Sequence, residues 1–207
     1  MKKIIFPLLL TFCLSSTVFA NEIQDEALDS LGTAQDFVKE GNYNKAVDEI
    51  NYALSKINEL TAETLLKFIP EPPKGYSLDN KQSQGVGAGA AIAGNAGATA
   101  QYSSPDGSTI SLNIAIGGMT GKMASLAAFG SMFAGLGQQT GMGQTTKIRS
   151  HGYTGTQIFN ANERSGTLTF QVGQKTSVTI DGTNIDSAKI LLQIAKDIDF
   201  AGLEKNY

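Results

Sequence analysis

Few residues in this sequence are suited to acid–base, nucleophilic or metal chemistry. The chain of 207 residues has one histidine, His151, and one cysteine, Cys13. The usual zinc sites need several Cys or His side chains and are therefore excluded. A Ser-His-Asp arrangement would have to use His151, and no Gly-x-Ser-x-Gly elbow presents a nucleophile. We interpret His151, beside Gly152 and Tyr153, as a loop or edge residue rather than a catalytic base.

The carboxylates beyond residue 70 are sparse and fall mostly in turns or near the C-terminus. Asp106-Gly107 and Asp181-Gly182 are turn sequences, and neither repeats at the Asp-x-Asp-x-Asp spacing of a calcium loop. No two acids can be named as the acid and base of a glycosidase. We therefore predict no catalytic residue, no metal site and no cofactor.

Residues 117–143 are apolar and rich in glycine. They hold four of the five Met residues and a single charge, Lys122. Apolar residues recur every three to four positions, which predicts a helix packed on a sheet. Met and Phe on a small-residue scaffold also form an adaptable apolar surface. As the alternative to a role in protein–protein contact, the protein is therefore a carrier. It would hold a small apolar or lipid ligand between sheet and helix, with Phe129, Met132 and Phe133 as its contacts.

The first twenty residues have the pattern of an export signal. Two lysines precede an apolar run over residues 4–14, and small residues end the segment at Ala20. Phe12 precedes Cys13 where a lipoprotein signal has a small residue, so ordinary cleavage is favoured over a lipid anchor at Cys13. We predict a periplasmic protein whose mature chain starts at Asn21, with no disulfide and no transmembrane segment.

Charge and proline divide the remaining chain. Residues 21–68 hold ten acidic and four basic residues, whereas residues 69–207 hold nine and ten. The net charge of −3 makes nucleic acid an unexpected partner. Three prolines lie between positions 70 and 73. We place a helical hairpin at 21–69, a Pro-rich linker at 70–84 and a sheet domain at 85–207.

The hairpin follows from apolar residues at helical spacing on both sides of Gly41-Asn42. Two helices joined by so tight a turn lie antiparallel, and we expect their apolar stripes to meet. The stripes are Ile23, Ala27, Leu31, Ala34 and Val38 in the first helix and Ala46, Ile50, Ala53, Leu54, Ile57, Leu60 and Leu65 in the second.

Within the hairpin, Gly41-Asn42-Tyr43 and the small residues Ala46 and Ala53 resemble a tetratricopeptide repeat. The resemblance covers residues 34–54 and a single repeat, which is too little for the peptide groove of a solenoid. We expect the hairpin to pack on its own second domain or on a protein partner, with Tyr43, Ile50 and Tyr52 as the contact residues.

Alternating apolar and polar residues predict strands in the second part, most clearly over 109–116. Further strands are predicted at 98–103, 145–150, 153–159, 166–172 and 176–180. The Gly/Ala segment 85–98 is either a strand paired with the residues that follow or a mobile loop. A final helix is predicted, with Asn184 as its N-cap. The fold class is α+β: the hairpin, then an antiparallel β-sheet covered on one face by two helices.

The Pro72-Pro73-Lys74-Gly75-Tyr76 entry and the closing Ile198-Asp199-Phe200-x-x-Leu203 give residues 72–203 a recognisable layout. It resembles a group of small exported bacterial proteins without an assigned activity, and PsbP-like α+β domains. The resemblance has no catalytic motif and transfers no site residue. We expect a non-enzymatic binding or accessory protein of the cell envelope, acting through protein–protein contact.

Overall fold

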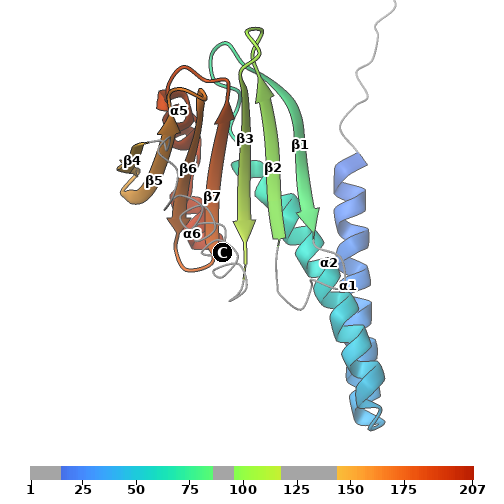
Figure 1. The fold of residues 1–207 in the computed structure, drawn as a ribbon. Coiled ribbons are helices and arrows are strands. Elements are labelled where there is room, and N and C mark those ends of the chain that lie inside the picture. The colour runs from blue at the N-terminus through green and yellow to red at the C-terminus, as the bar shows by residue number, and fades with distance from the viewer. Residues whose placement is uncertain (1–14, 86–95, 118–143) are drawn as a thin grey trace, which may run out of the picture. The chain divides into compact units, whose positions relative to one another are not determined.

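A computed structural model describes residues 15–85, 96–117 and 144–207 (Figure 1). The chain divides into two compact units between Ile57 and Asn58, and each unit is described by itself. The α+β fold class is confirmed. Two N-terminal helices pack together, and an antiparallel seven-stranded sheet and two C-terminal helices follow within the described residues.

The first unit is the predicted helical hairpin. Helix α1 (Ser15–Lys39) and helix α2 (Tyr43–Leu65) flank the turn, and α2 contributes its residues up to Ile57 to this unit. Gly41 has a φ of 77°, a conformation that glycine adopts without steric cost. The Asn42 N–H donates to the Phe37 carbonyl at 2.8 Å and the Gly41 N–H to the Val38 carbonyl at 3.1 Å. These two bonds form a Schellman motif, which ends α1.

Alanines form the seam between the two helices. Ala27 and Ala34 of α1 and Ala46 and Ala53 of α2 are all buried. Their short side chains let the two backbones approach closely. Beside them, the Ser30 hydroxyl donates to Glu49 Oε2 at 2.9 Å. The hairpin is therefore held by small side chains and a polar contact.

The second unit is built on one sheet with the strand order β1-β2-β3-β7-β6-β5-β4, antiparallel throughout (Figure 1). The strands are β1 (Ser77–Gly85), β2 (Ala96–Ser103), β3 (Thr109–Ile116), β4 (Gln144–Ser150), β5 (Tyr153–Asn160), β6 (Ser165–Val172) and β7 (Thr176–Thr183). The pairing of β3 with β7 joins the two halves of the sheet.

The register places apolar residues in rows across one face of the sheet. Leu112 pairs with Ala100 on one side and Ile180 on the other, and Ile180 pairs with Leu168. All four are buried. The alternation predicted over 109–116 is confirmed, because every second residue of β3 faces this core.

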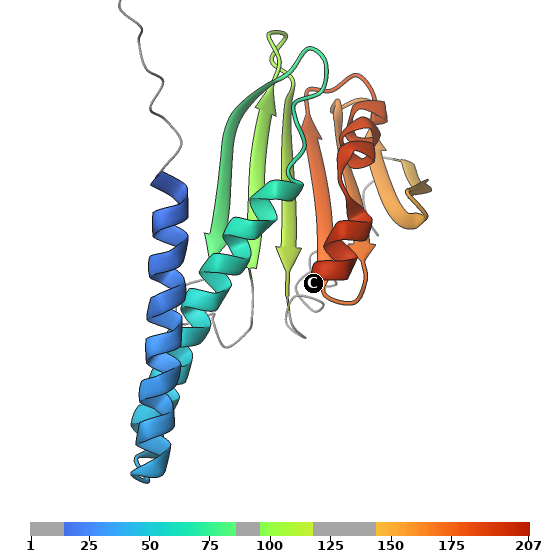
Figure 2. The same ribbon diagram turned by 180° about the vertical axis from the view of Figure 1, so that it is seen from behind.

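Helices cover this face. Short helix η1 (Leu66–Phe68), helix α5 (Lys189–Asp197) and helix α6 (Phe200–Asn206) belong to the second unit, and Figure 2 shows α5 and α6 on one face of the sheet. The residues that these helices and the last turns of α2 add to the core are Ala62, Leu65, Leu191, Ile194, Ala195, Phe200 and Leu203.

The predicted Pro-rich linker at 70–84 is wrong as a description of most of that segment. Strand β1 occupies Ser77–Gly85. Pro73 is buried, and the Pro70 carbonyl accepts a hydrogen bond from the Tyr102 hydroxyl at 2.8 Å. The sequence pattern does not predict this strand, because its residues are mostly polar on both faces. An edge strand tolerates this, since backbone pairing to one neighbour holds it.

The predicted N-cap at Asn184 is also wrong. Asn184 has a φ of 58°, and α5 begins at Lys189. The predicted single helix ends at Ile198, whose backbone is extended, and the chain starts again as α6. The Asp199 carboxylate caps α6 by accepting from the Gly202 N–H at 2.9 Å. An aspartate placed before an apolar residue starts a new helix more readily than it continues an old one.

Other predictions fall outside the described residues. They are the helix within 117–143, the interior of the Gly/Ala segment 85–98 and most of the export signal. The ends of the Gly/Ala segment are described, and there Gly85 of β1 pairs with Ala96 of β2. Helix α1 begins at Ser15, so it extends through the predicted cleavage position.

Candidate functional site

Large apolar side chains are exposed on the hairpin. Eight of them are between 41% and 67% exposed: Leu28, Leu31, Val38, Tyr43, Val47, Ile50, Tyr52 and Ile57. In the described part of the second unit, the large apolar side chain with comparable exposure is Leu78. Isolated exposed apolar residues are common, whereas a concentration on one element marks an interaction surface.

Helical spacing places most of these residues on stripes. Tyr43, Val47, Ile50 and Ile57 follow one another at steps of four, three and seven, with half-buried Leu54 between the last two. At about 100° per residue, such steps keep side chains on one side of a helix. In α1, Leu28, Leu31 and Val38 follow at steps of three and seven and form a second stripe.

The two stripes share one face of the hairpin. The alanine seam divides the surface of each helix into two sides. By helical angle, Glu26 lies on one side of α1 with the α1 stripe on the other, and Tyr52 and Lys56 lie on one side of α2 with the α2 stripe on the other. These sides coincide, because the Tyr52 hydroxyl donates to Glu26 Oε2 at 2.9 Å and Lys56 Nζ lies 2.7 Å from the same oxygen. Both stripes are on the other side of the seam. We call this surface the apolar face: Leu28, Leu31, Val38, Tyr43, Val47, Ile50 and Ile57.

The apolar face has no charge within it. By the same spacing, the polar residues interleaved with the α1 stripe are the amides Gln24 and Gln35. The charged residue nearest by helical angle, Lys39, is paired with Asp36 at 2.8 Å. The opposite face carries the charged groups, including the Glu26–Lys56 pair described above. The hairpin is thus acidic on one face and uncharged on the other.

The structure divides the three predicted contact residues. Tyr43 and Ile50 lie on the apolar face, whereas Tyr52 lies on the charged face, bound to Glu26. The prediction that the two apolar stripes meet is wrong for Leu31 and Val38 of α1 and for Ile50 and Ile57 of α2. Alanines occupy the seam, and these larger side chains are exposed. The sequence did hold a signal for this exposed surface. Leu31 and Val38 are seven residues apart, as are Tyr43, Ile50 and Ile57, and this spacing keeps each set on one side of its helix.

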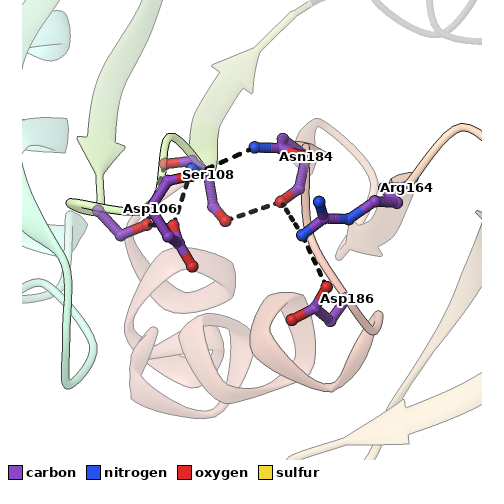
Figure 3. A network of polar contacts seen from close by, with 6 residues as sticks. Asp106, Ser108, Arg164, Asn184 and Asp186 are labelled. Carbon is purple, nitrogen blue, oxygen red and sulfur yellow. Dashed lines mark hydrogen bonds and ion pairs between the residues drawn. The ribbon is translucent and has the colours of Figure 1, made fainter.

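A second polar feature lies between the β2–β3 turn and the segment before α5 (Figure 3). Asp106 accepts from the Ser108 N–H at 3.0 Å, and the Ser108 hydroxyl donates to the Asn184 carbonyl at 2.7 Å. Arg164 Nη2 lies 2.7 Å from Asp186 Oδ1 and also donates to the Asn184 carbonyl at 3.3 Å. The network fastens three segments that are distant in the chain, because Arg164 lies in the β5–β6 turn.

Hydrogen bonds hold Asp106 in its charged form. The Ser104 hydroxyl, followed by the Ser108 N–H, lowers the pKa of Asp106 from 3.8 to about 2. A shallow pocket of about 320 Å³ lies beside this carboxylate, lined also by Tyr76, Asp186 and Lys189. Since Asp106 and Asp186 already accept from protein donors, we interpret the network as structural.

His151 makes structural contacts. Its Nε2 lies 2.6 Å from the Lys196 carbonyl, which can only accept, so this nitrogen donates. The ring packs edge-on against Phe200 with the centroids 6.2 Å apart. Among residues 15–85, 96–117 and 144–207, no three His, Cys, Asp or Glu side chains gather closely enough to hold a metal ion.

The predicted ligand contacts Phe129, Met132 and Phe133 lie outside the described residues, so the carrier alternative stays a prediction. Among the described helices, none combines the length and the apolar composition that a membrane crossing requires.

No family model, curated protein or solved structure matches the chain. The PsbP-like and tetratricopeptide resemblances therefore stay interpretations of the sequence.

Proposed function

We propose that this is a non-enzymatic accessory protein of the cell envelope, exported to the periplasm, that acts through protein–protein contact on the apolar face. One observation carries the proposal. The hairpin buries alanines in its seam and leaves its larger apolar side chains exposed together on one uncharged face. The export signal pattern at the N-terminus supports the location.

The spacing on the face supports a helical partner. Tyr43, Val47, Ile50, Leu54 and Ile57 alternate at steps of four and three, the repeat that packs helix against helix at a shallow angle. The stripe extends about 20 Å at a rise of about 1.5 Å per residue. Such a surface fits apolar α-helices without charged residues at the contact.

Burial supplies the driving force. Removing one Leu, Ile or Val side chain from water is worth about 1.5–3 kcal/mol when burial is complete. These side chains are already partly buried, so each contributes less than that. Several together act against the cost, about 4–15 kcal/mol, of bringing two molecules into a fixed arrangement, which is lowest when the partner is pre-formed.

Site-specific photo-crosslinking in the native envelope tests the proposal. A photoreactive phenylalanine at Val47 lies on the apolar face, and the same group at the neighbouring Asp48 points to the charged side. We expect protein adducts from position 47 that map to an apolar helical segment, and few from position 48. Equal adducts from both positions, or none from position 47, would reject the apolar face as the contact surface.

A further inference from the structure

We infer that a second copy of this chain covers the apolar face, so that two hairpins form a four-helix bundle. This dimer rests on the proposed function, since it names the occupant of the same face.

Charge favours a second copy over a basic partner. Residues 21–68 hold ten acids and four bases, so two hairpins that met through random surfaces would repel one another. The apolar face is free of charge, and a face-to-face pair keeps the acidic faces outermost. The helices of both copies then separate those acids by more than a Debye length of about 8 Å, which screens their repulsion. A basic partner would find no acid on this face to pair with.

The face also matches itself under a two-fold rotation. Ser30 bonds to Glu49, and Glu26 bonds to Tyr52, so residue numbers fall along α1 as they rise along α2. Leu31 therefore lies at about the level of Ile50. A two-fold axis that passes beside Leu31 and Ile50 brings these two residues of one copy against the same two residues of the other copy, as an isologous dimer requires.

The same counting places Val38 near Tyr43 at one end of the face and Gln24 near Ile57 at the other. The steps of three and four on both helices suit a left-handed bundle with shallow crossing angles. Gln24 and Gln35 lie within the α1 stripe, and a polar residue within such a seam specifies its register. A second hairpin supplies two helices of the required length and repeat.

Sedimentation equilibrium of the purified, signal-processed chain tests the dimer. We expect the wild type to have twice the mass of one chain at tens of micromolar. The double variant Leu31→Glu, Ile50→Glu is expected to weaken dimerisation by more than 100-fold, because it sets four carboxylates together at the two-fold axis. Asp48→Lys, an exposed change on the other side of α2, is expected to keep the dimer. Far-UV circular dichroism verifies that each variant is helical.

Disulfide trapping gives an independent readout. Leu31→Cys lies beside the proposed axis, so mild oxidation is expected to link two copies by a disulfide. Asp48→Cys lies on the outer side of α2, so it is expected to form no covalent link between the copies. If the double variant loses its helical signal, the trapping result with Leu31→Cys decides alone. A wild type that is monomeric at 100 µM, or a dimer unaffected by the double variant, overturns the inference. Adducts from Val47 to another protein would in that case leave the proposed function standing.

Discussion

The two units of this protein use their apolar side chains in opposite ways. The sheet unit buries its largest ones, with Tyr102, Phe170 and Phe200 at most 1% exposed. The hairpin buries alanines and leaves Tyr43 and Ile50 exposed. A sheet with helices laid over one face encloses large residues, whereas two helices alone share one narrow seam. The sheet unit encloses its large apolar side chains, and the hairpin leaves its own exposed, which is the surface that the proposed function assigns to a partner.

The largest effect is expected from Phe170→Ala in the sheet core. Phe170 is fully buried, and its ring lies 4.9 Å from that of Phe200. The cavity left behind is expected to lower the free energy of unfolding by about 3–5 kcal/mol, measured by urea denaturation. Ile50→Ala, measured at a concentration where the chain is monomeric, is expected to change it by less than about 0.5 kcal/mol. A comparable loss of unfolding free energy from both variants would contradict the contrast between buried and exposed apolar side chains.

A larger residue in the alanine seam is expected to have the next largest effect. Ala53 is fully buried, and Ala53→Leu would force the two helices apart. We expect a loss of about 1–3 kcal/mol, seen as faster amide hydrogen exchange in α1 and α2. The exposed substitution Val47→Leu is the control. Unchanged exchange in Ala53→Leu would mean that the seam does not hold the hairpin.

Glycine-to-alanine changes are expected to have opposite signs in the two units. A Cβ on Gly155 of β5 would lie 2.6 Å from the Phe170 ring and 2.8 Å from the Thr169 carbonyl oxygen, so Gly155→Ala destabilises by about 1 kcal/mol or more. A Cβ on Gly32 of α1 would meet nothing within 4 Å. Gly32→Ala is expected to stabilise the hairpin by about 0.5–1 kcal/mol through helix propensity. Thermal melts of the two variants that shift in the same direction would contradict this contrast.

The smallest effect concerns the pH dependence at Asp106. Its pKa is lowered to about 2 in the folded protein, below the ordinary 3.8. The unfolded state therefore binds the proton more tightly, and the stability that the charged carboxylate contributes is present above pH 4 and lost as the pH falls towards 2. Asp106→Asn is expected to flatten the unfolding free energy over this range, relative to Asp181→Asn. Identical pH profiles for wild type and Asp106→Asn would show that the turn does not need the charge.

Much of the fold was predictable because local periodicity encodes it. The turn at Gly41 and the alternation of β3 follow from spacing within ten residues or fewer. Strand β1 was missed because it has no apolar face, and helix α6 was not predicted as a separate element. The candidate site was half predicted. Tyr43, Ile50 and Tyr52 were predicted as contact residues, although Ile50 was also placed in the stripe expected to face α1. The structure exposes all three and places Tyr52 on the opposite face from the other two.

The sequence by itself determined the two hairpin helices, most of the described strands, the fold class and the separation of charge between the two parts. These properties depend on side-chain period and composition, which neighbours in the chain already fix. Tertiary structure alone decided that β3 pairs with β7 and that alanines, rather than Leu31 and Val38, form the helix seam. Both choices depend on how closely two backbones can approach. Alanine allows a close approach, and the larger apolar residues are left exposed on the apolar face.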